Sequence, residues 1–198
     1  KKVRITKARG SDQRSLMDLA DRNSRLYLEK LEKEAQGAKV LDQLQEAVHL
    51  SARPETIECF DISHLHGSGT VASMVQFKDG RQNKKNYRKY RIRTADNDDF
   101  MSMKEAVHRR YRRIRDEDGE MPDLILIDGG KGQLSSALEA FNELGLEDRP
   151  DMLAIAKKEE ELFKPERSIP IRLRRTDPAL LLLQRVRDEA HRFAVTYQ

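Results

Sequence analysis

The chain has 198 residues, of which 37% are hydrophobic and 36% are charged, and its formal net charge is +4. This length allows one well-cored domain with an appendage. The single cysteine, Cys59, excludes a disulfide framework within the chain, and no apolar run approaches the roughly 18 residues of a membrane span. We therefore expect a cytoplasmic protein with no membrane contact.

Residues 1–50 are predicted to form a helical lead-in or linker. Apolar residues recur there at helical spacing on both sides of Gln36-Gly37, namely Leu16, Leu19, Leu26 and Leu31, then Leu41, Leu44 and Val48. Arg53-Pro54 ends this region. The main domain is accordingly predicted over residues 51–198.

Three strands joined by short turns are predicted next, over residues 57–62, 70–77 and 87–93. The Asp79-Gly80 pair between the second and third strands is a hairpin signal. Asp61 stands out because it lies inside the apolar first strand. A carboxylate taken out of water in this way must raise its pKa, find a hydrogen-bonding partner or bind a cation.

The third predicted strand is strongly basic, with Lys89, Arg91 and Arg93 interleaved with Tyr90 and Ile92. Such a strand can bind the phosphate backbone of a nucleic acid. An equally weighted alternative is an edge strand whose positive charges prevent the sheet from extending into another molecule.

A helix starting at Asp98-Asp99 leads to a second acid-bearing strand over residues 123–128. Its apolar residues Leu124 to Ile127 predict a strand buried on both faces, and Asp128 ends it before Gly129-Gly130. The acid is therefore expected at the carboxyl edge of the sheet, where α/β folds bind ligands. The alternative is a helix N-cap or turn aspartate. A phosphate-binding P-loop is excluded, since Ile125 and Gly132 occupy positions that need Gly and Ser or Thr.

A helix ending near Gly145, a strand over residues 152–156 and a long final helix complete the predicted elements. The intervening charged run, residues 157–161, is expected to be solvated. Asp177-Pro178 is a helix start with proline at the first helical position. The final helix carries His191, for which simple packing against the sheet is the alternative to a functional role.

This element order predicts an α/β fold with a mixed five-stranded sheet and helices on both faces, the arrangement of ribonuclease-H-like nucleases. If the first strand is central, Asp61 and Asp128 lie on adjacent strands. Adjacent carboxylates repel each other unless a cation lies between them, and such hard oxygen ligands favour Mg²⁺ or Mn²⁺.

Three segments resemble the motifs of the UvrC family, the nuclease component of excinuclease ABC: ECFDISH at 58–64, LIDGGKGQL at 126–134 and RDEAHRFA at 187–194. The resemblance implies the endonuclease domain that makes the 5′ incision in damaged double-stranded DNA during bacterial nucleotide excision repair. Carried onto these motifs, the catalytic and metal-binding triad is Asp61, Asp128 and His191.

The resemblance also implies parts that this sequence lacks. These are an N-terminal nuclease domain for the 3′ incision, a segment that binds the excinuclease component UvrB and a C-terminal helix-hairpin-helix tail. We therefore expect a fragment of a longer protein. The segment 154–167 is more acidic than the family pattern suggests, which weakens any DNA-binding role for it.

Two other functions compete with a metal-dependent DNA endonuclease. A phosphotransferase or ATPase of the same fold class is disfavoured by the absence of a phosphate loop. A non-catalytic nucleic-acid-binding module is compatible with the basic strand alone. Metal-dependent nicking distinguishes the nuclease from the binding module.

Overall fold

A computed structural model of the chain describes residues 10–65, 69–93, 98–146, 149–157, 159–165 and 167–196. The chain divides into two compact units, Lys1–Gly37 and Ala38–Gln198. Helix α1, Ser11–Val48, begins in the first unit and ends in the second. The two helical stretches expected on either side of Gly37 are thus one continuous helix, and the part of the predicted lead-in before residue 10 lies outside the described residues.

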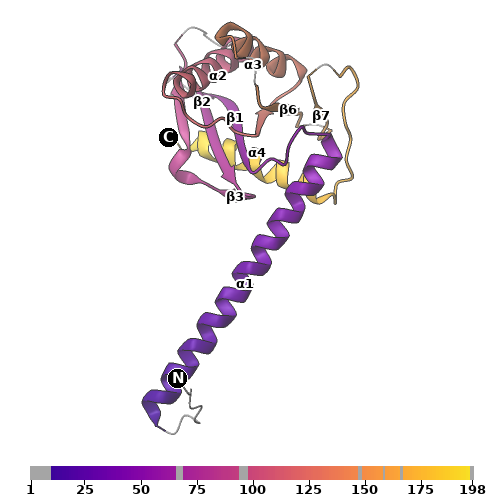
Figure 1. Cartoon of the computed structure of the whole chain (residues 1–198). Helices are drawn as coiled ribbons and strands as arrows, with labels where there is room; N and C mark the ends of the chain where they lie inside the picture. The colour runs from indigo at the N-terminus through magenta and orange to yellow at the C-terminus, as the bar shows by residue number, and fades with distance from the viewer. Residues whose placement is uncertain are drawn as a thin grey trace. The chain divides into compact units, whose positions relative to one another are not determined.

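The larger unit is built on a mixed sheet of seven strands among the described residues (Figure 1). The strands are β1 Thr56–Leu65, β2 Gly69–Lys78, β3 Arg81–Gln82, β4 Arg88–Arg91, β5 Leu124–Asp128, β6 Asp151–Ile155 and β7 Leu162–Phe163. Their order is β3-β2-β1-β5-β6-β7, with β4 also paired to β2. The β1–β5 and β5–β6 pairs are parallel and the others antiparallel.

The mixed sheet and its central β1 are as predicted, but the predicted number of strands was too low. The five expected strands correspond to β1, β2, β4, β5 and β6. Strands β3 and β7 have two residues each, which is too short for an alternating pattern to be detected. A short 3₁₀ helix, η1 at Lys84–Asn86, separates β3 from β4.

The remaining helices are α2 Asp99–Asp116, α3 Lys131–Leu144 and α4 Pro178–Val195, and local sequence signals mark the starts of α2 and α4 and the end of α3. The side chain of Asp98 accepts hydrogen bonds from the first turn of α2, and the side chain of Asp177 accepts one from the first turn of α4. Gly145 ends α3 in the left-handed conformation, with φ of 64°. No helix in the described part of the chain combines the length and apolarity needed to span a membrane.

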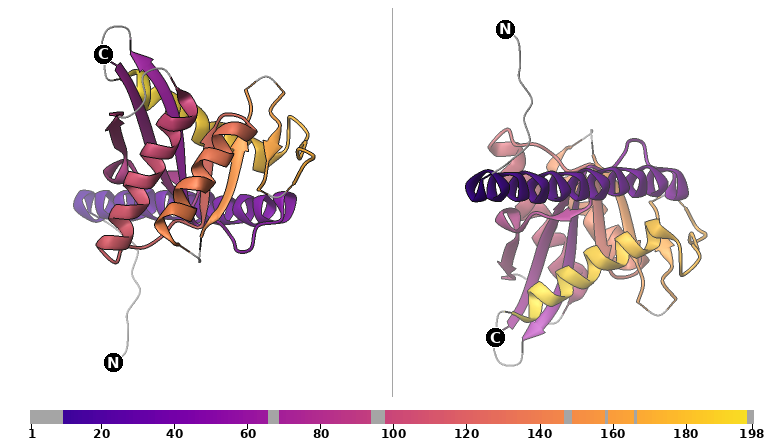
Figure 2. Two further views of the ribbon diagram at one scale, coloured as in Figure 1. Left: turned by 90° about the horizontal axis from the view of Figure 1, so that it is seen from above. Right: turned by 90° about the horizontal axis from the view of Figure 1, so that it is seen from below.

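Helices α2 and α3 cover one face of the sheet and α4 covers the other (Figure 2). Alternate residues of β5 explain why both faces are covered. Leu124 and Leu126 pack in the core on the α4 side, whereas Ile125 and Ile127 pack against α2 and α3. By the same alternation Asp128 lies on the α4 face, and so does Asp61, since Ile57 and Cys59 of β1 face that side.

The end of α1 belongs to the larger unit because its apolar residues are part of that unit's core. Leu41, Leu44 and Val48 are fully buried in the cluster on the α4 side. The compact units therefore divide at Gly37–Ala38, earlier in the chain than the boundary at residue 50 suggested by Arg53-Pro54.

A buried charge on the opposite face connects β1 to α2. The Glu58 carboxylate accepts hydrogen bonds from Arg110 at 2.6 Å, from the hydroxyl of Tyr111 at 2.8 Å and from Gln76 at 3.0 Å. A buried carboxylate needs such partners to offset its loss of hydration. The network fixes the central strand against its covering helix.

Candidate metal centre

The two strand acids, Asp61 and Asp128, lie side by side at one edge of the sheet. Phe60 is paired with Ile127 in the parallel β1–β5 register, so the next residue of each strand is an aspartate. Both side chains face α4 and both residues are buried, with 2% and 6% of their surface exposed. Asp61 lies inside β1, which continues to Leu65, and the parallel register places it beside Asp128, the last residue of β5, as predicted for a central first strand.

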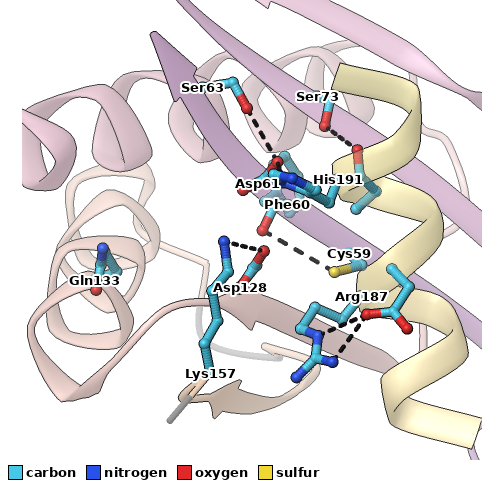
Figure 3. Close-up of polar contacts among 12 residues, drawn as sticks. Cys59, Phe60, Asp61, Ser63, Ser73, Asp128, Gln133, Lys157, Arg187 and His191 are labelled. Carbon is cyan, nitrogen blue, oxygen red and sulfur yellow. Dashed lines mark hydrogen bonds and ion pairs between the residues drawn. The ribbon is translucent and has the colours of Figure 1, made fainter. Parts of the chain in front are cut away.

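His191 reaches this pair from α4, which is held against the sheet by a buried hydroxyl. Ser73 of β2 is the register partner of Asp61, and its Oγ donates to the carbonyl oxygen of Ala190 at 2.8 Å. The next residue, His191, places its Nδ1 3.2 Å from Oδ2 of Asp61 (Figure 3). One ligand atom from each of Asp61, Asp128 and His191 lies within 4.8 Å of the others.

The environment of Asp128 disfavours its charged form. Burial raises the pKa of this carboxyl from its ordinary value of 3.8 to about 6, and the negative charge of Asp61 contributes to the increase, while Lys157 opposes it. Neither carboxylate oxygen accepts a hydrogen bond from the described residues. The Nζ of Lys157 makes an ion-pair contact of 3.4 Å with Oδ2.

These residues fit a divalent metal ion. A buried carboxylate whose oxygens lack hydrogen-bond donors is costly unless a cation occupies the space beside it. Two carboxylates supply hard oxygen ligands suited to Mg²⁺ or Mn²⁺, and an imidazole nitrogen is readily accepted by Mn²⁺. The donor set is therefore compatible with a divalent cation, and its geometry does not identify which one.

The site opens into a cavity of about 380 Å³ lined by Asp128, Lys157, Arg187, Asp188 and His191. The guanidinium of Arg187 is fixed at its wall by two hydrogen bonds to Asp188, of 3.0 and 2.8 Å, and one of 2.6 Å to Glu160. The expectation that residues 157–161 form a solvated charge run fits the exposed Lys157, which nevertheless contacts Asp128, but it is wrong for Glu160, which is half-buried against Arg187. Their run follows β6, which ends at the same edge of the sheet as Asp128.

The glycine-rich segment after Asp128 forms the turn into α3. The backbone N–H of Gly130 donates to Oε1 of Gln133 at 2.8 Å, and Gly130 is itself the N-cap of α3. A Cβ added at Gly129 would lie 2.6 Å from the same Gln133 oxygen, so a side chain there would displace the Gln133 amide from Gly130. The alternative in which Asp128 caps the helix is thereby excluded.

The predicted DNA-binding residues lie on or just after β4, and none of them lines the cavity. Lys89 is half-buried, with its Nζ 4.5 Å from the ring centroid of Phe193 and 3.4 Å from Oγ1 of Thr196. Arg91 and Arg93 are exposed. Both the phosphate-binding and the edge-guarding interpretations remain compatible with this placement.

Three residues at the site were given no role from the sequence: Ser73, Lys157 and Arg187. No periodic signal marked Ser73, because its pairing with Asp61 depends on the register between β1 and β2. Arg187 stands one helical turn before His191 and therefore shares its side of α4. Lys157 had no comparable signal, since its direction depends on the loop after β6.

A family model described as the UvrC RNAse H endonuclease domain matches residues 45–195. UvrABC system protein C of Methanospirillum hungatei is 47% identical over 197 residues, which cover 99% of this chain and 36% of that protein. The same-named protein of Methanosarcina acetivorans is 46% identical over 198 residues, covering 100% of this chain and 37% of that protein. The chain thus spans little more than a third of the length of these relatives.

Among solved structures, Ciona intestinalis Endonuclease V in complex with an inosine-containing DNA is similar over 66% of this chain and 58% of that one. The sequence identity is 14% and the TM-score 0.39, a likeness too distant to support a functional comparison. The family match and the two relatives are sufficient by themselves: this chain belongs to the UvrC RNase H endonuclease domain family.

Proposed function

We propose that this chain is the unit of a nucleotide-excision-repair nuclease that makes the 5′ incision, by metal-dependent hydrolysis of a phosphodiester bond in DNA. The observation that carries the proposal is the buried pair Asp61 and Asp128, with His191 brought over it by α4. The two oxygens of Asp128 lack hydrogen-bond donors among the described residues, as expected of a buried carboxylate that serves as a metal ligand.

In this proposal Asp61, Asp128 and His191 hold one divalent cation, Mg²⁺ or Mn²⁺. Asp61 is kept in place by the hydroxyl of Ser63, which donates to its Oδ2 at 3.1 Å. His191 must be neutral to present a ligand nitrogen. The cation, when bound, supplies positive charge to the phosphate and lowers the pKa of water.

The proposed substrate is damaged double-stranded DNA, and the proposed partner is the excinuclease component UvrB, through a segment outside this chain. The curated relatives carry the name UvrABC system protein C, and the chain covers only 36–37% of their length. The basic side chains Lys89, Arg91 and Arg93 are proposed to contact the DNA backbone.

The test is incision of a duplex with one lesion by the full-length protein that contains this chain, with Mg²⁺ and with a chelator. We expect Asp61→Asn and Asp128→Asn to slow the 5′ incision by orders of magnitude while DNA affinity stays nearly unchanged. If wild-type protein binds the duplex but does not nick it with Mg²⁺ or with Mn²⁺, the chain is a non-catalytic binding module and the proposal is rejected.

A further inference from the structure

Lys157 is placed at the metal centre by the pairing of β6 with β5. Asp128 is the register partner of Ile155, and the N–H of Gly129 donates to the carbonyl oxygen of Ile155 at 3.2 Å. The loop that leaves β6 therefore starts at the level of Asp128. Two residues later Lys157 directs its Nζ to Oδ2 of Asp128, 3.4 Å away (Figure 3).

The two partners of the Lys157–Asp128 contact differ strongly in their exposure to solvent. The side chain of Asp128 is completely buried, whereas 63% of the side chain of Lys157 is exposed. An ion pair of a largely solvated lysine contributes at most about 1 kcal/mol to stability, because the ammonium keeps much of its hydration and gives up side-chain freedom. Stabilisation of the fold is therefore a weak reason for this placement.

The negative charges of the two neighbouring aspartates give a better reason for the position of Lys157. Asp61 and Asp128 stand next to each other, and without a cation their negative charges are uncompensated. The ammonium of Lys157 supplies one positive charge from the solvent side. A divalent cation that uses the oxygens of Asp128 carries two charges and competes directly with this ammonium, so both cannot occupy the same oxygen.

The cavity is also lined by Arg187, but this residue cannot neutralise Asp128 and then move to a phosphate. Its side chain is only 12% exposed and its guanidinium is held by Asp188 and Glu160. Its charge is compensated and its position is fixed. Lys157 has a flexible stem, three donors and a single contact of 3.4 Å to Asp128, so its ammonium can turn into the cavity once a cation displaces it.

We propose that Lys157 is an exchangeable cation of this site: it neutralises Asp128 before the metal ion binds, and after displacement it binds a non-bridging oxygen of the scissile phosphate. This inference rests on the proposed function, since it requires a phosphodiester in the cavity. It assigns Lys157 two successive partners, the carboxylate and then the phosphate.

The proposal makes metal affinity and incision change in opposite directions when the lysine is removed. Mn²⁺ binding to this chain, measured by titration calorimetry, should be about 2- to 5-fold tighter in Lys157→Ala, because the competing ammonium is gone. At saturating Mn²⁺ and DNA, 5′ incision by the full-length protein should be roughly 100-fold slower, because one donor to the phosphate is lost. Lys157→Arg should keep near-normal Mn²⁺ affinity and part of the incision rate.

Lys78→Ala is the matched control, since Lys78 is an exposed lysine at the end of β2 with no ion pair to either acid among the described contacts. It should leave Mn²⁺ affinity and incision unchanged. Unchanged or weaker Mn²⁺ binding in a folded Lys157→Ala chain overturns the proposal, and so does normal incision by that variant. Failure of the proposed function is recognised separately, because then the wild-type protein itself does not incise.

Discussion

The hydroxyl of Ser73 donates a 2.8 Å hydrogen bond to the carbonyl oxygen of Ala190, and this contact joins β2 to α4 directly beside the following histidine. Ser73 is fully buried and is paired across the strands with Asp61. One side chain therefore relates the position of a strand acid to that of a helix histidine 130 residues away from it.

Replacing Ser73 by alanine should remove this link. We expect Ser73→Ala to lower the free energy of unfolding by about 1 kcal/mol, the net value of a typical hydrogen bond. Mn²⁺ affinity should fall as well, because α4 is free to shift relative to Asp61. Chemical denaturation and calorimetry measure the two effects.

Ser102→Ala is the control for the loss of a buried hydroxyl. The Oγ of Ser102, in α2 on the other face of the sheet, is buried without a hydrogen-bond partner in the described residues. This change should be neutral or slightly stabilising and should leave Mn²⁺ affinity intact. Equal metal affinity in both variants would show that Ser73 does not position His191.

The raised pKa of Asp128 predicts a pH-dependent stability of the metal-free protein. Because the folded-state pKa is about 6 and the ordinary value is 3.8, the folded chain binds more protons between these pH values. Stability should therefore fall as pH rises through this window, by an amount on the order of 3 kcal/mol from this group. Above pH 6 the full penalty of the charged, buried carboxylate is present.

Asp128→Asn tests this sign directly. In the presence of a chelator the variant should be more stable than wild type at pH 7.5, and the difference should shrink towards pH 4.5. Urea denaturation at a series of pH values gives the comparison. A variant that is less stable than wild type at pH 7.5 would mean that the charged form of Asp128 is stabilised in the fold.

Metal binding should stabilise the folded chain through His191 as well as through the acids. At a Mn²⁺ concentration of 100 times the dissociation constant, a ligand specific for the folded state adds about 2.7 kcal/mol. For a domain of this size that corresponds to an increase in melting temperature of roughly 5–10 °C. His191→Ala should lose most of this increase, while the melting temperature in a chelator stays close to that of wild type.

His108→Ala in α2 is the matched histidine variant, because His108 lies outside the residues that could hold a metal. It should retain the whole Mn²⁺-dependent increase. The same loss in both variants would indicate a general effect of histidine removal and would take His191 out of the ligand set.

The basic strand makes a prediction about salt. If Lys89, Arg91 and Arg93 contact phosphates, their combined replacement by alanine should reduce the slope of log K against log salt concentration by up to about 3, since each contact releases about 0.9 counterion. Fluorescence anisotropy with an undamaged duplex measures the slope.

Arg112→Ala with Arg113→Ala is the control, because these exposed arginines pair with Asp116 and Glu117 of their own helix. An unchanged slope in the strand variant would leave its charges as guards of an edge strand.

Features that depend on a few consecutive residues were predictable from the sequence. The apolar run of β5, the caps Asp98 and Asp177 and the glycine at the end of α3 each act within one or two turns of chain, and the structure has them where expected. Helix α1 continues through Gly37, since glycine in a helix costs only about 1 kcal/mol relative to alanine.

Features that depend on the mutual position of elements were not predictable in the same way. The proximity of Asp61 and Asp128 followed from the topology, because β1 and β5 are adjacent parallel strands whose register puts the two acids at the same level. The contact of Lys157 with Asp128 and that of Glu160 with Arg187 depend on the path of a charged loop, for which the sequence has no periodic pattern. The sequence pattern of a charged run is therefore the same whether its side chains are solvated or line a cavity.

The long sequence separation inside the metal centre has a consequence for folding order. Asp61 and His191 are 130 positions apart, and the Ser73–Ala190 bond closes a span of 117. Contacts of such high separation form late, after the chain entropy of the intervening segments has been lost. If the proposed triad holds the metal ion, a nascent or partly folded chain in which α4 has not docked contains both aspartates but no third ligand, so tight metal binding and the proposed incision should be delayed until the last helix is in place.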